Sequence, residues 1–347
     1  MTTQAETVLI PTTVMGSYPQ PRWLIDHERL KGAGVPRVRE GDIWSVAPEH
    51  LDEAIEAATF VAIADQEAAG VDIITDGEIG RESYFNHFAN ALGGVDRNAI
   101  GVGMNRVGGK SKVPLVNGPI VRTEPVELDA ARFLVAHSSR RVKVTVPGPF
   151  TLSELADDQH YGDRRELALA YADAVNEELR DLAQAGVDML QIDEPYLQAN
   201  AGVAREIALE VITRAVRDVE APITLHTCYG YALYVSEKAG GYPFFAELAA
   251  MPVDNIAIET AQPGLDPRLI AELAPRGVVL GVLDLGRRTV ETAEEIAIRI
   301  RQALEVIEPD KLSVSPDCGM KFLPRAVAQA KLAAMVAGAA IVRSELV

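Results

Sequence analysis

Short apolar runs rich in Val, Ile and Leu recur along the chain, and longer amphipathic segments separate most of them. Near-continuous apolar runs are typical of strands in a parallel sheet that is covered on both faces. We therefore predict eight strands, over residues 8–14, 71–75, 141–146, 187–192, 222–225, 255–258, 278–283 and 311–315.

The segments between these strands have the period of amphipathic helices. Residues 164–185, for example, place Leu167, Tyr171, Val175 and Leu182 on one face. We predict helices over residues 51–69, 164–185, 203–218, 291–306 and 328–342. Eight strands alternating with helices predict an α/β fold, a (β/α)8 TIM barrel, with residues 1–347 in a single domain. A doubly wound open sheet is the alternative, but no G-x-G-x-x-G motif follows a strand here.

Two long segments interrupt the alternation of strands and helices. Residues 17–50 follow the first predicted strand and carry both tryptophans. Residues 79–140 follow the second, and within them residues 101–121 are expected to form a hairpin. In a barrel, long loops that follow strands lie on the C-terminal face, where active sites are built. We therefore expect two insertions on that face, after strands 1 and 2.

Composition places the chain among soluble globular proteins. It has 48% hydrophobic and 24% charged residues, and it lacks an apolar run long enough to span a membrane. The N-terminal residues do not have the basic and apolar regions of a signal peptide, so we expect a cytoplasmic protein. The net charge of −17 disfavours nucleic acids and anionic membranes as partners, although a small anionic substrate is compatible with it.

Polar residues end most of the predicted strands. They include Ser17, Asp76, Glu78, Asp193, His226, Glu259, Asp284 and Asp317. A single acidic residue in such a place is as typical of a helix N-cap as of a functional site. The set as a whole is harder to explain by capping, because a barrel would bring all of these residues to one face.

Both cysteines, Cys228 and Cys318, follow predicted strands, and His226 lies two residues before the first of them. Residues i and i+2 of an extended chain point to the same side, so His226 and Cys228 can face one point. With Glu259 and Cys318 they would supply a tetrahedral N, S, O and S ligand set for Zn²⁺. A carboxylate ligand is easily displaced, and the natural incoming ligand at such a site is a thiol. Buried inert thiols are the alternative interpretation, whereas a disulfide is not expected in the cytoplasm.

Seven motifs occur in order between residues 10 and 340. They are Met15-Gly16-Ser17-Tyr18-Pro19-Gln20, Asp76-Gly77-Glu78, Gly148-Pro149-Phe150-Thr151, Gln191-Ile192-Asp193-Glu194-Pro195, His226-Thr227-Cys228-Tyr229, Ile258-Glu259-Thr260 and Pro316-Asp317-Cys318-Gly319-Met320-Lys321. As a set they resemble the C-terminal catalytic barrel of cobalamin-independent methionine synthase. The resemblance implies a zinc-dependent methyltransferase of methionine biosynthesis, which converts homocysteine to methionine.

The resemblance also implies roles for individual residues. The family's zinc ligands match His226, Cys228, Glu259 and Cys318. Its substrate-binding residues match Met15, Gly16, Ser17, Glu78 and Asp193. The two acids would hold the amino group of homocysteine, and the backbone and hydroxyl of residues 15–17 would hold its carboxylate. We expect Asp193, Glu78 and His226 to be the catalytic residues.

The methyl-donor side departs from the family pattern. The family's full-length enzyme has a second, N-terminal barrel, for which this chain has no room. A tryptophan that packs against the pterin in the family is replaced by Leu152-Ser153-Glu154-Leu155, and a histidine after the seventh strand is replaced by residues 285–288. The expected donor is therefore methyltetrahydrofolate or a methyl group on cobalamin or a corrinoid protein.

Two other functions stay open at this point. Some barrel relatives transfer an alkyl group to another thiol, as in the reaction of an epoxide with coenzyme M. Arg287, Arg288 or Lys321 could bind its sulfonate, but Glu78 and Asp193 favour an amino acid. The other alternative is a non-catalytic protein that binds homocysteine or zinc. His87 and His160 could each line the pocket, but a structural role is favoured for both.

Overall fold

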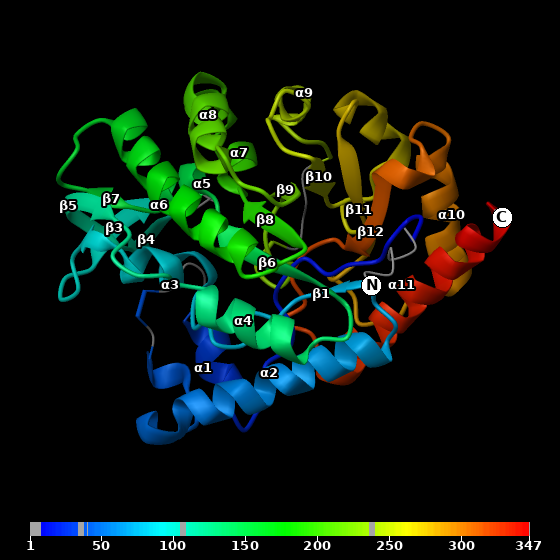
Figure 1. Ribbon diagram of the computed structural model, residues 1–347, viewed down its shortest axis with the longest axis horizontal. Coiled ribbons are helices and arrows are strands. Elements are labelled where there is room, and N and C mark those ends of the chain that lie inside the picture. The colour runs from blue at the N-terminus through cyan, green and yellow to red at the C-terminus, as the bar shows by residue number, and fades with distance from the viewer. Residues whose placement is uncertain (1–7, 34–37, 40, 105–108, 236–239, 347) are drawn as a thin grey trace.

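Seven parallel strands form the main sheet of the computed structural model, which describes residues 8–33, 38–39, 41–104, 109–235 and 240–346. The strands follow the order β1, β6, β8, β9, β10, β11, β12, and they curl around a common interior (Figure 1). Their bounds are β1 (Ile73–Ile74), β6 (Arg141–Pro147), β8 (Met189–Asp193), β9 (Ile223–Thr227), β10 (Asn255–Ile258), β11 (Gly277–Leu283) and β12 (Leu312–Pro316). Seven of the eight predicted strands are thereby confirmed.

The first predicted strand, residues 8–14, is not a regular strand. It contributes two isolated parallel bridges, from Thr12 to Val314 of β12 and from Thr13 to Ile73 of β1. Pro11 has no N–H to donate, and residue 10 has a φ of 50° in the left-handed region, so the segment pairs only through these isolated bridges. The segment nevertheless contacts both edge strands of the sheet.

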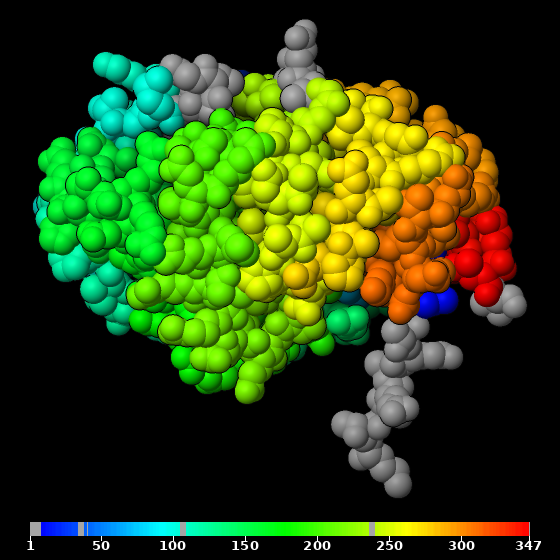
Figure 2. All heavy atoms as spheres, turned by 90° about the horizontal axis from the view of Figure 1, so that it is seen from above, coloured from blue at the N-terminus to red at the C-terminus, as the bar shows by residue number. Residues whose placement is uncertain are grey.

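Helices cover the outer face of the sheet (Figure 1). The five predicted helices are confirmed as α2 (Leu51–Ala68), α6 (Arg164–Gln184), α8 (Ala201–Val216), α10 (Ala293–Leu304) and α11 (Arg325–Glu345). Shorter helices are α1 (His27–Gly32), α3 (Tyr84–Ala91), α4 (Leu128–His137), α5 (Pro149–Glu154), α7 (Tyr196–Ala199) and α9 (Phe245–Leu248), with 3-10 turns η1 (Gly41–Ile43), η2 (Pro48–His50), η3 (Pro267–Leu273) and η4 (Pro309–Lys311). Figure 2 shows the green, yellow and orange segments side by side in chain order.

The two long interrupting segments fold differently from each other. Residues 17–50 contain α1, η1 and η2, whereas residues 79–140 contain α3, α4 and four short strands. The predicted hairpin is present as β3 (Gly101–Met104) paired with β4 (Lys110–Val113), and its turn, residues 105–108, lies outside the described residues. The rest of that prediction is wrong, because β5 (Leu115–Val121) pairs instead with β2 (Gly93–Val95) and β7 (Asp157–Asp158).

One helix in the described part of the chain, α11, is long and apolar enough to meet the length and hydropathy criteria for a membrane span. Its buried face packs against α10 and contains Lys331, whose Nζ lies 2.7 Å from an oxygen of Glu291. Core helices of globular proteins meet the same criteria, so length and composition alone are weak evidence for a span.

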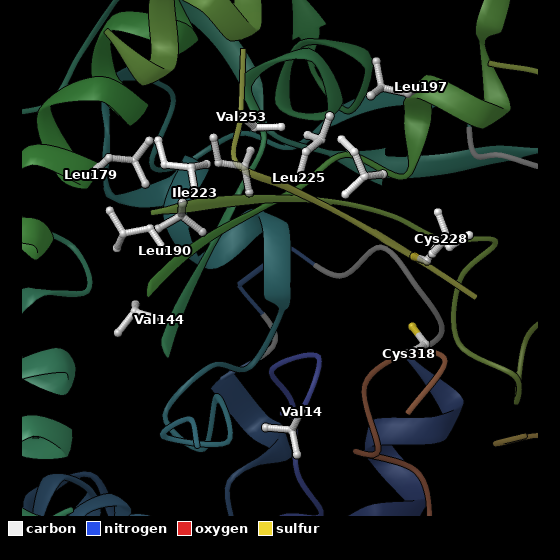
Figure 3. Packing of buried hydrophobic residues seen from close by; sticks show 14 of the residues in the cluster. Val14, Val144, Leu179, Leu190, Leu197, Ile223, Leu225, Cys228, Val253 and Cys318 are labelled. Carbon is white, nitrogen blue, oxygen red and sulfur yellow. The ribbon is translucent and has the colours of Figure 1, made fainter. Parts of the chain in front are cut away.

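Side chains alternate along each strand between the face of the sheet that packs on the helices and the face that lines the interior of the curled sheet. In β6, Val144 belongs to the main apolar cluster, whereas Lys143 and Thr145 on either side are buried on the opposite face. Figure 3 shows Val144, Leu190 and Leu225, from three neighbouring strands, among the residues of that cluster. The apolar face packs on the helices, whereas the inner face of the curled sheet combines polar side chains with a small apolar cluster of Met15, Ala257 and Val279.

Candidate active site

A pocket of about 160 Å³ lies at the carboxyl ends of the central strands. Its lining includes seven of the predicted site residues, namely Met15, Ser17, Glu78, Asp193, His226, Cys228 and Cys318. Much of the remaining wall is aromatic, from Tyr84, Phe85, Tyr196, Tyr231 and Tyr234. The two other predicted residues, Gly16 and Glu259, lie behind this lining, and Glu259 is fully buried.

Three of the four predicted metal ligands lie together. The Sγ atoms of Cys228 and Cys318 and a carboxylate oxygen of Glu259 lie within 4.8 Å of one another. Strand register explains part of this: Thr227 of β9 pairs with Ile258 of β10, so the next residues on each strand leave the sheet side by side. Figure 3 shows the sulfur atoms of Cys228 and Cys318 turned toward each other.

His226, the fourth predicted ligand, lies outside that group of three. It is the register partner of Asp193, and its Nδ1 lies 2.9 Å from Oδ1 of that residue. Burial would lower the pKa of His226, but Asp193 and Cys228 raise it to about 9 in the metal-free protein. Its Nε2 is buried without a hydrogen-bond partner in the described part of the chain.

The four residues fit Zn²⁺. Two thiols, a carboxylate and an imidazole are ligand types that zinc prefers, and tetrahedral zinc with sulfur ligands at about 2.3 Å places ligand atoms roughly 3.8 Å apart. A buried ring nitrogen without a partner costs stability unless a ligand satisfies it. A metal-bound histidine usually directs its other nitrogen to a carboxylate, which matches the contact of His226 with Asp193.

Asp317 fixes the loop after β10 against the end of β12. Its carboxylate accepts hydrogen bonds from the backbone N–H groups of Thr260, Ala261 and Gln262, at 3.1, 3.0 and 2.5 Å. One of these loops carries Glu259 and the other carries Cys318. Asp317 therefore ties two ligand-bearing loops together, a role that the sequence analysis did not assign.

Glu78 is buried in the wall of the pocket. Its Oε1 accepts a hydrogen bond from Thr145 Oγ1 at 3.0 Å. Burial raises the pKa of Glu78 to about 8, with a contribution from Asp193 and against the opposing charge of Arg81. Gly16 makes room for this carboxylate, because a Cβ at Gly16 would lie 2.1 Å from Glu78 Oε1.

A buried lysine and glutamine lie on the inner face of the sheet. Lys143 Nζ donates to Gln191 Oε1 at 2.6 Å, and Gln191 Nε2 donates to the carbonyl of Met15 at 3.1 Å and to Asp193 Oδ1 at 2.7 Å. Burial lowers the pKa of Lys143 to about 7. These bonds fix two parts of the pocket wall relative to each other. The sequence analysis named Gln191 only as part of a motif and assigned no role to either residue, although a lysine within an apolar run was a usable signal.

Ser17 packs against the loops that follow β9 and β12. Its Oγ lies 3.3 Å from the hydroxyl of Tyr231, and its carbonyl accepts a hydrogen bond from the N–H of Met320 at 2.7 Å. A Cβ at Gly319 would lie 2.1 Å from Ser17 Oγ, so glycine is needed beside this hydroxyl. The predicted carboxylate-binding residue is thus held next to the loop of Cys318.

The other residues singled out from the sequence do not line this pocket. Nδ1 of His87 lies 3.0 Å from Oε2 of Glu82, and His160 is exposed. Arg287 and Arg288 line a neighbouring cavity instead.

Comparison with known proteins agrees with the resemblance. Residues 10–341 match the family model for the catalytic domain of cobalamin-independent synthase. A methionine synthase from Sulfolobus acidocaldarius is 34% identical over 344 residues, covering 98% of this chain and 94% of the relative. A methionine synthase from Thermococcus kodakarensis is 34% identical over 346 residues, covering 98% and 96%.

A solved structure leads to the same family. The B12-independent methionine synthase from Shewanella sp. W3-18-1, in complex with selenomethionine, matches with a TM-score of 0.88 and 32% identity, covering 98% of this chain and 99% of that one. The relatives are methyltransferases of about the same length as this chain. The chain therefore belongs to the cobalamin-independent methionine synthase family of methyltransferases, whose catalytic domain it spans.

Proposed function

We propose that this methyltransferase transfers a methyl group to the sulfur of homocysteine in a zinc-dependent reaction. The observation that carries the proposal is a single pocket lined by two cysteines, Cys228 and Cys318, and by two carboxylates, Glu78 and Asp193. The first pair suits a metal that binds a thiol, and the second suits an ammonium group. The Shewanella relative in complex with selenomethionine supports a pocket of this kind, since selenomethionine is an analogue of the product.

His226, Cys228, Glu259 and Cys318 would hold the zinc ion. Bound zinc supplies Lewis acidity, which keeps a coordinated thiol in its thiolate form near neutral pH. Asp193 keeps the ring of His226 oriented through the 2.9 Å contact with Nδ1. The ring therefore presents Nε2 as its ligand atom.

Glu78, Asp193 and Ser17 would hold the amino-acid end of homocysteine. An ammonium group beside Glu78 would favour its ionised form, although burial raises its pKa to about 8 in the free protein. With the amino acid held, the substrate sulfur attacks the methyl carbon in line with the leaving group. The new sulfur–carbon bond forms as the bond from methyl to donor breaks, and the protein contributes chiefly by positioning.

For the donor we propose methyltetrahydrofolate or a methyl group on cobalamin or a corrinoid protein. Leu155 belongs to the stretch that replaces the family's tryptophan. It lines the pocket of about 160 Å³ that contains Cys228 and Cys318, which we call the thiol pocket. An aliphatic wall there leaves both donors as candidates.

We also propose that residues 11–14 complete a (β/α)8 barrel around this site, within one domain of residues 1–347. The bridges of Thr12 and Thr13 to the two edge strands support this closure. The two buried cysteines are not joined in a disulfide, which suits a reducing cytoplasm.

Transfer to a sulfonate thiol such as coenzyme M is less well supported. The sulfonate would need a cation in the pocket, but Lys321 is outside the lining and donates to the carbonyl of Arg81 at 2.9 Å. The acidic residues of the lining, Glu78 and Asp193, favour an amino acid instead.

The decisive test supplies zinc-loaded protein with homocysteine and either methyltetrahydrofolate or methylcobalamin, and measures methionine by mass spectrometry. We expect methionine from at least one donor. Homocysteine binding without methionine from either donor would overturn the proposed reaction and favour a non-catalytic binding protein.

Cys318→Ser tests the metal site. We expect this variant to lose its zinc on dialysis, and full zinc retention would contradict the ligand set.

A further inference from the structure

A second cavity, of about 240 Å³, adjoins the thiol pocket at the carboxyl ends of β11 and β12. The loop after β11 contributes residues 285–288, and the loop after β12 contributes residues between 319 and 323. We call this space the arginine cavity, after Arg287 and Arg288 in its lining. Tyr231 and Gly319 line both the arginine cavity and the thiol pocket, so the two spaces share a wall.

The arginine cavity combines an apolar floor with a cationic edge. Leu285 and Met320 in its lining are buried, and the ring of Phe322 stands edge-on to that of Tyr231, with centroids 5.0 Å apart. None of the described residues in its lining is acidic. Such a surface suits a molecule with an apolar body and an anionic group.

The two arginines differ in how far their charges are already matched. Arg287 has two loose ion pairs, at 3.5 Å to Asp284 and 3.7 Å to Glu291. Arg288 is exposed and has no ion pair or side-chain hydrogen bond with the described residues. Its charge is therefore available to a ligand, in a chain whose net charge is −17.

A third cavity, of about 580 Å³, is a poorer place for an anion. It shares Tyr196 with the thiol pocket, but its lining contains Glu154 and Asp158. Arg164, the arginine among its described lining residues, lies 3.3 Å from Glu154 and is already paired. An anionic group would meet these two carboxylates there, so the arginine cavity is the better candidate.

Position in the fold supports the same assignment. In barrels of parallel strands, the loops after the last two strands frequently bind phosphate groups. Here the loop after β11 supplies Arg287 and Arg288, and the loop after β12 supplies the facing residues Gly319, Met320 and Phe322. Cys318, a predicted ligand of the metal, directly precedes Gly319 of the shared wall.

We propose that the arginine cavity binds an anionic group of the methyl donor, a carboxylate or a phosphate, with Arg288 as its main contact. The bound anion holds the donor beside the thiol pocket, so that the methyl group can reach across the wall of Tyr231 and Gly319. The inference rests on the proposed methyl transfer. The two candidate donors carry different anions, since folate has the carboxylates of its glutamate and cobalamin has a nucleotide phosphate.

Steady-state kinetics of Arg288→Gln test the inference. We expect the KM for the donor to rise roughly tenfold, as for loss of one charge-assisted hydrogen bond, while the KM for homocysteine stays within about twofold. Arg288→Lys should recover part of the donor affinity. Arg132→Gln is the matched control, because Arg132 is an exposed arginine on α4.

Donors that lack the anion identify its source. Methyltetrahydropteroate lacks the glutamate of methyltetrahydrofolate, and methylcobinamide lacks the phosphate of methylcobalamin. For the true donor, removal of the anion should raise KM in the wild-type protein and should have little further effect in Arg288→Gln. Additive effects of the two changes, or an unchanged donor KM in Arg288→Gln, would overturn the inference and leave the methyl transfer intact.

Calorimetric titration with inorganic phosphate separates this inference from the proposed function. If neither donor yields methionine, the proposed function fails, but the anion site can still be judged. Phosphate binding that weakens at least fivefold in Arg288→Gln and not in Arg132→Gln supports the site. Absent binding, or equal binding in all three proteins, rejects it.

Discussion

Asp193 connects the predicted metal ligands of the candidate site with the hydrogen-bond network on the inner face of the sheet. Its Oδ1 accepts a hydrogen bond from Gln191 and lies 2.9 Å from Nδ1 of His226, so one carboxylate contacts both the inner-face network and a predicted metal ligand. Cysteines at strand ends made Cys228 and Cys318 visible in the sequence. Lys143 was assigned no role: its place in an apolar run indicated a buried charge, but nothing in the run identified Gln191 as its partner.

The hydrogen bond of Lys143 gives a first prediction at this scale. Lys143→Met keeps the volume of the side chain but cannot donate to Gln191, so Gln191 is free to turn away from Met15 and Asp193. We expect the KM for homocysteine to rise about fivefold to tenfold, with a smaller change in kcat. Steady-state kinetics measure this, and Lys311→Met, at an exposed lysine, is the control. An unchanged KM would show that Gln191 keeps its orientation without the lysine.

The burial of Glu78 predicts a pH-dependent effect on stability. The pKa of Glu78 rises from 4.5 to about 8 in the folded protein. The folded state therefore binds this proton more tightly than the unfolded state, and the wild-type protein loses stability as pH rises through that window. Glu78→Gln cannot ionise, so it should raise the free energy of unfolding at pH 9 by roughly 1–3 kcal/mol and have much less effect at pH 5.

Urea unfolding of the metal-free protein at pH 5, 7 and 9 measures this difference. Asp129→Asn, at a fully exposed carboxylate, should show no such trend. Equal stabilisation by Glu78→Gln at all three pH values would contradict a raised pKa of Glu78 in the folded protein.

At the scale of elements, register and loop anchoring bring the ligands together. Pairing of β9 with β10 places Cys228 beside Glu259, and Asp317 ties the loop after β10 to the end of β12. The sequence pattern predicted the long helices because each buries one clear face, and it predicted seven strands because each is a near-continuous apolar run. It could not predict the partners of β5, because pairing among short strands depends on side chains distant in sequence.

Removal of the Asp317 carboxylate should loosen two ligand-bearing loops at once. In Asp317→Ala, three backbone N–H groups lose their acceptor, and we expect a loss of about 3 kcal/mol in unfolding free energy. Zinc affinity should fall at least tenfold, measured by competition with a chromophoric chelator. Asp266→Ala, which removes an exposed cap of η3, is the control for zinc. Lower stability with unchanged zinc affinity would show that the ligands do not depend on this anchor.

At the scale of the whole molecule, the helix α11 contacts the segment that precedes β1. Arg343 of α11 donates to the carbonyls of Leu9 and Ile10, each at 2.9 Å, and contacts Asp72 just before β1. The sequence predicted the alternation of strands and helices and the family. It did not predict the contact of Arg343 or the bridges of Thr12 and Thr13, because neither leaves a repeating pattern of apolar residues in the sequence.

Arg343→Ala should therefore act on the site from a distance. It removes bonds to the segment that leads into Met15, and we expect about 1–3 kcal/mol of lost stability together with weaker homocysteine binding. Thermal unfolding and equilibrium binding measure the two effects. Arg301→Ala, which breaks exposed ion pairs on α10, should cost less than about 1 kcal/mol. Equal effects of both variants would show that the contact with the N-terminal segment is unimportant.

The pairing of Thr12 with β12 also bears on how the protein is made. Residues 15–17 leave the ribosome long before β12, the strand against which their segment pairs. The contact of Arg343 with Leu9 spans 334 positions, and the pocket itself cannot be complete before Cys318 has been translated. Contacts of such long range form slowly. A nascent chain that stops before β12 would therefore present unpaired edges and both halves of an unfinished catalytic site, which is the stage at which chaperones would matter most.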